Sequence, residues 1–191
     1  MKNIGVFCGS NSGNCIEFKN YAYQLGQKLA EQNIGLVYGG AKVGLMGTVA
    51  NGVLENGGRV TGVLPHFLKE KELAHEGLNE IVLVETMHQR KAKMYELSDG
   101  IIVLPGGFGT LDEMFEFLTW GQLALHKKPT GLLNTNGYYN HLMSFINTTI
   151  ENGFVKDEYR KMLLISEDID DLLEQMKGYV PKTNDKWFVT K

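Results

Sequence analysis

The stretch GIIVLPGGFGTLDE, residues 100–113, decides the fold of this chain. It begins with a short run of branched apolar residues, Gly100–Leu104, and passes through a proline and three glycines into a helical pattern that begins at Thr110. An apolar strand that turns directly into a helix is the building unit of parallel α/β sheets. The stretch therefore predicts a strand, a tight turn at the carboxyl edge of a sheet, and a helix.

The same alternation extends in both directions from this stretch. Most of the expected strands are apolar throughout, as parallel strands covered on both faces should be. They are Ile4–Cys8, Gly35–Tyr38, Arg59–Leu64, Glu80–Glu85, Gly100–Leu104, Pro129–Leu133 and Leu163–Ser166. Helical spacing of apolar residues appears from Phe18 to Leu29 and from Leu45 to Leu54, and further helices are expected at Met87–Leu97, Thr110–Leu125, Tyr138–Asn152 and Ile169–Met176. This order predicts an α/β fold with a doubly wound parallel sheet.

One domain is expected, over residues 1–181. A chain of 191 residues with 43% hydrophobic and 21% charged residues has the composition of a folded globular domain and not of a disordered segment. Residues 182–191 form a polar C-terminal tail in this interpretation, with Trp187 and Phe188 able to dock back onto the domain.

Composition also bears on partners and location. The formal net charge of −3 gives no basic surface of the kind that binds nucleic acid. No apolar run approaches the roughly 18 residues of a membrane span, and the N-terminal apolar run is too short for a signal peptide. Two cysteines, Cys8 and Cys15, give no disulfide framework, so a cytoplasmic location is expected.

Glycine is the unusual residue of this chain. Its 23 occurrences are about 12% of the residues, against an average near 7%. Four expected strand exits carry unusual residues: GSNSGN at Gly9–Asn14, GGAKVG at Gly39–Gly44, TMHQRK at Thr86–Lys91 and PGGFGT at Pro105–Thr110. Because ligands of open α/β sheets bind beyond the carboxyl ends of the strands, these exits mark the expected site.

The turn PGGFGT is expected to hold a phosphate group. It opens a helix, so its free backbone N–H groups and the positive end of the helix dipole face the edge of the sheet. Glycine at Gly106, Gly107 and Gly109 lets the main chain approach an anion closely. The chain has neither the G-x-x-x-x-G-K-[ST] of a nucleoside-triphosphate loop nor a G-x-G-x-x-G after the first strand. A mononucleotide therefore fits the pattern better than NAD or ATP.

Glu113 has two interpretations. Thr110 and Glu113 have the spacing of a capping box, in which each side chain binds the backbone amide of the other residue. In the functional interpretation, the carboxylate lies one helical turn from a bound phosphate, at the distance of the ribose that is attached to that phosphate. The two interpretations are compatible with each other.

Arg90 also has two interpretations. Thr86 and Gln89 are expected to form a capping box at the start of the helix that carries Arg90 in its first turn. Because helical side chains lean toward the N-terminus, Arg90 would lean into the crevice, where its guanidinium can bind phosphate or carboxylate. The alternative is a solvated surface arginine.

Other polar and sulfur-containing residues are expected to have structural roles. Asp99 precedes a strand and so lies at the opposite edge of the sheet. The histidines His75, His88, His126 and His141 share no metal-ligand spacing, so no metal site is expected. Core packing is expected for Cys8, Met87, Met94, Met114 and Trp120, while Glu116 and Thr119 extend the helix face that begins at Glu113.

Several motifs occur together along the chain: FCGS (Phe7–Ser10), GGAKVGLMG (Gly39–Gly47), MHQRK (Met87–Lys91), PGGFGTLDE (Pro105–Glu113) and the stretch Phe117–Tyr139. In combination they resemble the LOG, or LONELY GUY, family of cytokinin riboside 5′-monophosphate phosphoribohydrolases, and the likeness covers nearly the whole chain except the tail. Members often carry the label "lysine decarboxylase". The residues here do not support that label, because nothing marks a Schiff-base lysine.

The resemblance implies a Rossmann-like homodimer that hydrolyses the N-glycosidic bond of AMP-type nucleotides, without a cofactor, to free base and ribose 5-phosphate. It makes Glu113 and Arg90 the catalytic residues. The implied substrate-binding residues, taken with the glycine loops, are Gly9, Ser10, Gly40, Lys91, Gly106, Gly107, Phe108, Gly109, Thr110, Leu111, Asp112 and Thr119. Ala41 stands where many members have glycine, and Asp112 where many have glutamate.

Two alternatives belong to other classes of protein. A nucleotide-binding sensor or carrier could use the same phosphate seat without chemistry, although simple phosphate binding needs neither Glu113 nor Arg90. A pyridoxal-phosphate decarboxylase would be a coloured protein. The preferred base and the size of the assembly are left open by the sequence.

Overall fold

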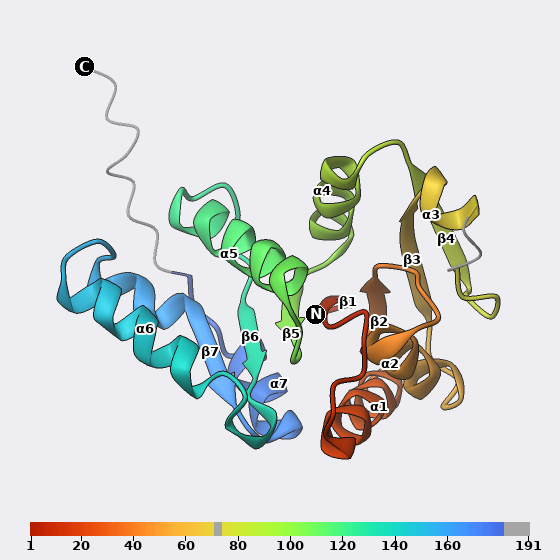
Figure 1. Ribbon diagram of the computed structural model, residues 1–191, viewed down its shortest axis with the longest axis horizontal. Helices are drawn as coiled ribbons and strands as arrows, with labels where there is room; N and C mark the ends of the chain where they lie inside the picture. Colours follow the sequence, from red (N-terminus) through yellow and green to blue (C-terminus); the bar gives the residue numbers. More distant parts are fainter. Residues whose placement is uncertain (71–73, 182–191) are drawn as a thin grey trace.

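Seven parallel strands form one sheet through the centre of the molecule (Figure 1). The computed structural model describes residues 1–70 and 74–181, so the expected tail with Trp187 and Phe188 lies outside the described residues. The strands are β1 (Asn3–Phe7), β2 (Gly35–Tyr38), β3 (Val60–Pro65), β4 (Glu80–Val84), β5 (Gly100–Val103), β6 (Thr130–Leu133) and β7 (Leu163–Ser166). Their order is β4-β3-β2-β1-β5-β6-β7. The seven expected strands are confirmed, with ends that differ by no more than one residue.

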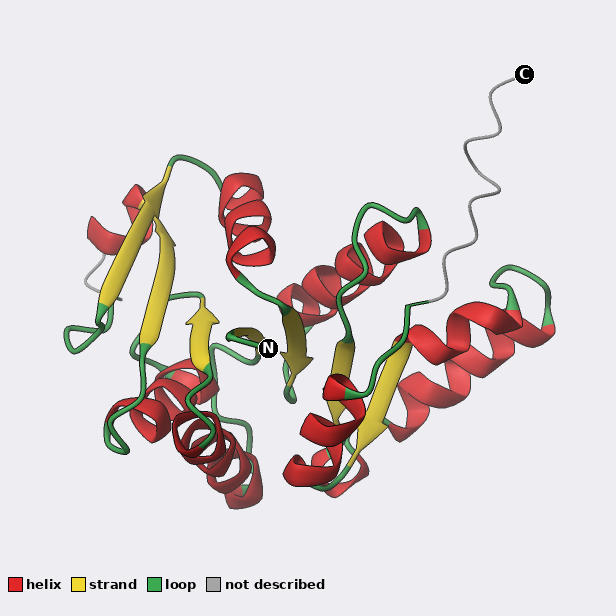
Figure 2. Cartoon of the chain, turned by 180° about the vertical axis from the view of Figure 1, so that it is seen from behind, coloured by secondary structure: helices red, strands yellow, loops and turns green. Residues whose placement is uncertain are grey.

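Helices cover both faces of the sheet (Figure 1, Figure 2). One face carries α1 (Ile16–Glu31), α2 (Gly44–Leu54) and α7 (Ile169–Lys177), and the other carries α4 (Met87–Leu97), α5 (Phe108–Gln122) and α6 (Asn140–Glu151). Shorter elements are α3 (His66–Glu70), η1 (Thr135–Gly137) and η2 (Asp157–Met162). The short α3 was not expected, because five residues are too few to show a helical period. The predicted doubly wound α/β sheet in a single domain is confirmed.

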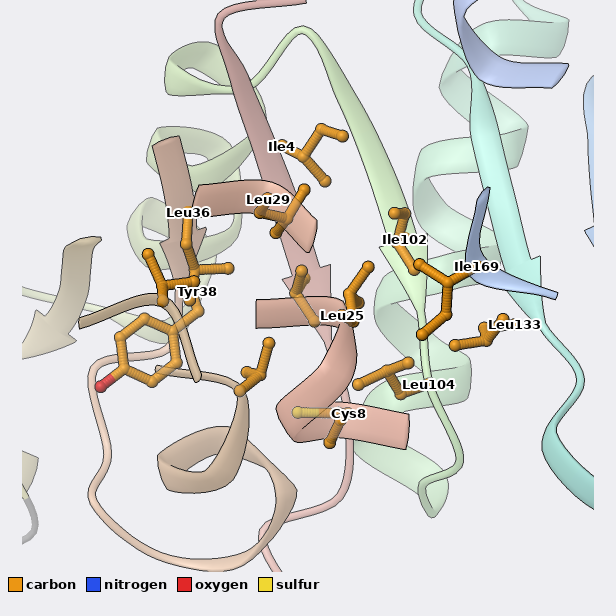
Figure 3. Packing of buried hydrophobic residues seen from close by; sticks show 14 of the residues in the cluster. Ile4, Cys8, Leu25, Leu29, Leu36, Tyr38, Ile102, Leu104, Leu133 and Ile169 are labelled. Carbon is orange, nitrogen blue, oxygen red and sulfur yellow. The ribbon is translucent and has the colours of Figure 1, made fainter. Parts of the chain in front are cut away.

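The strands are apolar throughout because successive side chains enter two different cores. In β1, Ile4 belongs to the core under α1, α2 and α7 (Figure 3), whereas Phe7 belongs to the core under α4, α5 and α6. In β5, Ile102 belongs to the first of these cores and Ile101 to the second. A strand whose neighbouring side chains point to opposite faces must be apolar at every position when both faces are covered.

The chain reverses its direction of winding between β1 and β5, which are neighbours in the sheet. β1 leads into α1 on one face, and β5 leads into α5 on the other. Backbone hydrogen bonds join the two exits, from Gly9 N to Pro105 O at 3.0 Å and from Leu104 N to Phe7 O at 2.9 Å. Such a reversal opens a crevice beyond the carboxyl ends of the two strands.

The start of α5 corrects one prediction. The helix begins at Phe108 with Gly107 as its N-cap, two residues before the expected start at Thr110, and it has no side-chain cap. Glu113 is therefore too far into the helix to form a capping box with Thr110. Since Gly107 carries no polar side chain, the first N–H groups of α5 are left for another partner.

The capping box expected at the start of α4 is confirmed. Thr86 is the N-cap, and its hydroxyl accepts a hydrogen bond from Gln89 N at 3.1 Å. The Gln89 side chain in turn accepts from Thr86 N at 3.3 Å. This box fixes the start of the helix that carries Arg90.

In the described part of the chain, no helix combines the length and apolar character that crossing a bilayer requires.

Candidate active site

A cavity of about 600 Å³ lies at the reversal point between the exits of β1 and β5. All four unusual strand exits contribute to its wall. Among the lining residues are Gly9–Gly13 after β1, Gly39, Leu45 and Met46 after β2, Met87 and Arg90 on α4, and Pro105–Thr110 and Glu113 after β5, with Phe18 and Tyr138 at one side. Phe18, Met46 and Tyr138 were not predicted as residues of the site, because they come from separate elements that only the fold brings together.

The start of α5, where the sequence predicts an anion-binding seat, opens into this cavity. A Cβ atom at Gly107 or Gly109 would meet no heavy atom within 4 Å, so the main chain there is open to a ligand. At Gly106 a Cβ atom would lie 2.2 Å from Thr110 Oγ1, so this glycine permits the tight turn itself. The free N–H groups of the first helical turn and the helix dipole both favour a negative charge here.

The loop after β1 forms the facing wall, and α2 supports it from behind. Ser10–Ser12 line the cavity. Leu45 N donates a hydrogen bond to Gly9 O at 3.1 Å, and a Cβ atom at Gly44 would lie 2.3 Å from the backbone of Ser10. The second glycine loop therefore holds the first one in place and does not form a separate anion seat. Gly40, predicted to bind substrate, is not among the residues that line the cavity.

Arg90 is buried beside the cavity, with 8% of its surface exposed. Its Nε donates a hydrogen bond to the carbonyl oxygen of Val63, within strand β3, at 3.1 Å. Burial lowers the pKa of Arg90 below its usual value, and the nearby Glu113 opposes this effect. The interpretation of Arg90 as a solvated surface arginine is therefore wrong, because the side chain is buried and hydrogen-bonded to the backbone of β3.

Glu113 lines the same cavity from the second turn of α5. Burial raises the pKa of its carboxyl group to about 7, although the positive charge of Arg90 acts in the opposite direction. A half-neutral carboxyl group at physiological pH, next to a buried cation and in a cavity, has the properties of a functional acid or base. Its position supports the functional interpretation and not the capping one.

Lys91 ties α4 to α5 outside the cavity. Its Nζ lies 3.0 Å from a carboxylate oxygen of Asp112 and 3.0 Å from one of Glu116. Burial lowers the pKa of Lys91, but the hydrogen bonds to the two carboxylates outweigh burial and the net pKa is raised. Tyr95 adds a further tie, since its hydroxyl donates to Glu113 O at 2.8 Å. These contacts hold the helix of Arg90 against the helix of Glu113.

The remaining predicted substrate-binding residues separate into two groups. Gly9, Ser10, Gly106, Gly107, Phe108, Gly109 and Thr110 line the cavity, and Phe108 at its mouth is 94% exposed. Leu111, Asp112 and Thr119 are not among the lining residues. Thr119 donates a hydrogen bond to Phe115 O at 2.7 Å and lines a smaller groove between α5 and α6.

The residues expected to have structural roles differ in where they lie relative to the cavity. Met87 was expected in the core, but it is 40% exposed and lines the cavity, because it is the first residue of α4. Met94 and Met114 are buried as expected. Cys8 is buried at the end of β1 (Figure 3), and burial raises the pKa of its thiol. Asp99 accepts from Asn3 N at 3.1 Å, at the edge opposite the cavity, as expected.

The doubly wound sheet, and the cavity at its carboxyl edge that Glu113 and Arg90 line, define a Rossmann-like protein with one candidate active site. Comparison with known proteins adds the family. The family model described as "Possible lysine decarboxylase" matches residues 46–176. The cytokinin riboside 5′-monophosphate phosphoribohydrolase LOG1 of Arabidopsis thaliana is 45% identical over 95% of this chain and 85% of its own length, and LOG2 of the same plant is 44% identical over 100% and 89%. The chain belongs to the LOG family of phosphoribohydrolases.

Solved structures of lower identity share the fold. The molybdenum cofactor binding protein from Rippkaea orientalis superposes with a TM-score of 0.70 at 24% identity, covering 92% of this chain and 95% of that one. The Moco carrier protein from Chlamydomonas reinhardtii gives a TM-score of 0.68 at 20% identity, with the same coverage. At this level of identity, the likeness establishes the Rossmann-like fold alone.

The description "lysine decarboxylase" implies pyridoxal phosphate, and the residues do not fit that cofactor. A Schiff base needs a lysine in the cavity with a lowered pKa. No lysine of residues 1–70 and 74–181 lines the cavity, and nearby Lys91 is paired with two carboxylates that raise its pKa. The same described residues contain no group of three or more His, Cys, Asp or Glu side chains arranged to hold a metal ion.

Proposed function

We propose that the protein hydrolyses the N-glycosidic bond of AMP-type nucleoside 5′-monophosphates, cytokinin riboside monophosphates among them, and releases the free base and ribose 5-phosphate. One observation carries the proposal. A single cavity places an open helix N-terminus, a buried arginine and a carboxyl group with a pKa of about 7 within reach of one small ligand. The names of the relatives in Arabidopsis thaliana agree with this reaction.

The 5′-phosphate binds at the start of α5. The amides of Gly107–Thr110 and the helix dipole take the negative charge, and Ser10 on the facing loop adds a hydroxyl group. A cavity of about 600 Å³ falls within the range of small-molecule sites and accommodates a mononucleotide. With the phosphate in this seat, the ribose lies toward Glu113, about one helical turn further along α5.

Glu113 and Arg90 carry out the chemistry. Water attacks C1′ as the bond from C1′ to the base nitrogen breaks, and the bonding electrons leave with the base. The Glu113 carboxylate accepts a proton from the water or holds the ribose hydroxyls, and it stabilises the positive charge that develops on the ribose. Arg90 orients the substrate, and the departing base takes up the proton that the attacking water gives up, so that the products are neutral base and ribose 5-phosphate.

The predicted substrate-binding residues divide between contact and support in this proposal. Those that line the cavity bind the nucleotide directly. Lys91 and Asp112 hold α4 against α5 and so set the spacing of the Arg90 and Glu113 side chains. Gly40, Leu111 and Thr119 do not line the cavity, so they do not contact the ligand in this proposal.

Product analysis tests the proposal. Purified protein is incubated with a panel of nucleoside 5′-monophosphates, and with the dephosphorylated ribosides as controls, and free base is separated by chromatography. We expect base from monophosphates and little or none from ribosides. Equal reaction of the riboside would refute the phosphate seat. Tight nucleotide binding without release of base would show a carrier or sensor instead.

We also infer that the protein is a cytoplasmic homodimer. Both cysteines are free, which suits a reducing compartment. A groove between α5 and α6 is lined by Phe115, Phe145 and other apolar residues, with Arg160 as the charged residue among them. An apolar patch can pair with the same patch on a second copy around a twofold axis. Light scattering of the wild type and of Phe145→Asp tests this: a dimer that becomes a monomer supports the inference, and a wild-type monomer contradicts it.

A further inference from the structure

Gly39, at the exit of β2, lies directly against the guanidinium of Arg90. A Cβ atom built on Gly39 would be 1.7 Å from Arg90 Nη2 and 2.9 Å from its Cζ. Real Cβ atoms essentially never approach another heavy atom closer than 3.0 Å. The backbone of Gly39 does not have a positive φ, so an L-residue could adopt its conformation. The reason for glycine here is the space that Arg90 occupies.

The adjacent glycine has a different physical cause. Gly40 has a φ of 76°, which side chains rarely tolerate, and its Cβ atom would lie 1.8 Å from Leu64 Cδ1. Gly40 also packs close to Gly62 on the neighbouring strand β3. It therefore serves the backbone turn and the packing of β2 on β3, whereas Gly39 touches a residue of the site.

We propose that Gly39 is a positioning residue for the reaction proposed above: its missing side chain provides the space that holds the Arg90 guanidinium against β2, bonded to Val63 O and facing Glu113. The proposal rests on the proposed function for its effect on activity. Its structural part, the place of the guanidinium, stands independently.

A methyl group at position 39 would displace the arginine and not the strand. Tyr38, the residue directly before Gly39, pairs with Val6 of β1 on one side and with Gly62 of β3 on the other, so the end of β2 cannot shift far without disturbing the centre of the sheet. Arg90 Nη2 is the far end of a long side chain with several rotatable bonds and yields first. Met46 Sδ, 3.2 Å from the same Cβ position, needs to move by only a few tenths of an ångström. The substitution therefore moves the guanidinium away from the site and leaves the fold in place.

Moving Arg90 also changes the electrostatic environment of Glu113. The charged and titratable groups that act on or face Glu113 are Arg90, Lys91 and Tyr95 from α4, Asp112 and Glu116 from α5, and Cys8 from the exit of β1. Among these, Arg90 makes the largest contribution that favours the carboxylate. When its charge moves away, Glu113 holds its proton to higher pH, and the pH at which activity rises moves upward.

The first experiment compares Gly39→Ala with the wild type and with Gly178→Ala. A Cβ atom at Gly178 would have its nearest contact at 3.5 Å, far from the cavity, so this variant controls for the added methyl group. For Gly39→Ala we expect kcat/KM to fall about 10- to 100-fold, the range of one lost hydrogen-bonded charged contact. In the plot of kcat/KM against pH, the rise in activity of this variant should occur at a higher pH than that of the wild type. Unchanged kcat/KM and an unchanged pH profile would overturn the proposal.

A double-mutant cycle separates positioning from a general structural effect. Lysine has no Nη2 atom, so Arg90→Lys should cost much less activity in the Gly39→Ala background than in the wild type. Fully additive losses would overturn the proposal. If Gly39→Ala lowers the melting temperature or fails to fold, adding Arg90→Ala should restore stability by removing the clash, and no restoration would count against it.

The structural part has its own readout. A crystal structure of Gly39→Ala should show the Arg90 guanidinium displaced from the end of β2 and its hydrogen bond to Val63 O broken, with the strand unmoved. If Arg90 is still in its wild-type position, the proposal is contradicted. If the wild type releases no base from any monophosphate, the proposed function fails while this crystallographic test still applies. The two failures are therefore distinguishable.

Discussion

Replacing Glu113 with glutamine should nearly abolish turnover. The introduced amide keeps the size and hydrogen-bonding capacity of the protonated acid but cannot accept a proton or carry the negative charge that opposes the charge on the ribose. General acid–base assistance is typically worth about 10² to 10⁴ in rate. We therefore expect kcat for Glu113→Gln to fall by that factor, while KM for the monophosphate changes little because the substitution does not touch the proposed phosphate seat at the start of α5.

The same substitution should make the protein more stable at neutral and higher pH. The pKa of Glu113 is raised from an ordinary value of 4.5 to about 7 in the folded state. A raised pKa means that the protonated form favours folding, so stability is highest below pH 4.5 and is lost as the pH rises through 7. At about 1.4 kcal/mol for each pKa unit, the loss is up to about 3 kcal/mol. Glutamine stays neutral and avoids this loss.

Thermal unfolding at several pH values, together with an assay of base release, measures both effects. At pH 8 the melting temperature of Glu113→Gln should exceed that of the wild type by roughly 6 to 12 °C, since a domain of this size shifts about 2 to 4 °C per kcal/mol. At pH 4.5 the two should melt together. Glu151→Gln, an exposed carboxylate on α6, is the matched control and should show neither effect. Retained activity with a large loss of stability would refute this account of Glu113.

Three further predictions follow from the same geometry. In the wild type, kcat/KM should rise with pH through about 7 as Glu113 ionises, and a flat profile between about pH 6 and 8 would contradict its role as a carboxylate. Thr86→Ala removes the capping box of α4 and should lower the free energy of unfolding by about 1 kcal/mol in chemical denaturation, with no change expected for the exposed Lys19→Ala. Lys91→Met removes the positive charge that offsets the negative charges of Asp112 and Glu116 beside Glu113, so the pH at which kcat/KM rises should move upward. A move to lower pH would contradict the role of these two ion pairs.

The fold was predictable because its signals are local. Each strand of a covered parallel sheet is a short apolar run, and each is followed by turn residues and a helical period, so the strands could be placed to within one residue. The start of α5 was misplaced for a local reason as well. Thr110 and Glu113 fit a capping box, but the helix begins at Phe108, where glycine supplies no cap. Backbone geometry overrode the side-chain signal at this point.

The site was predictable only in part, because its members meet through the fold. The unusual strand exits indicated the correct edge of the sheet, and the capping box at Thr86 located the helix of Arg90, but the sequence left open whether Arg90 turns into the crevice or toward solvent. Phe18 on α1 and Tyr138 after β6 gave no such signal, yet their rings lie 5.5 Å apart at the side of the cavity. Contacts between distant elements of this kind have no counterpart in the order of residues along the chain.

The glycines show this limit most clearly. Gly39, Gly40 and Gly107 all follow strands and look equivalent in the sequence, but each is glycine for a different physical reason. At Gly40 the backbone has a positive φ, and at Gly107 the main chain is open to a ligand. At Gly39 the cause is the guanidinium of a residue 51 positions further along the chain. A glycine-rich exit therefore locates the binding edge of the sheet, while the side chains of neighbouring exits decide which glycine a substitution would turn into a defect of stability, of binding or of catalysis.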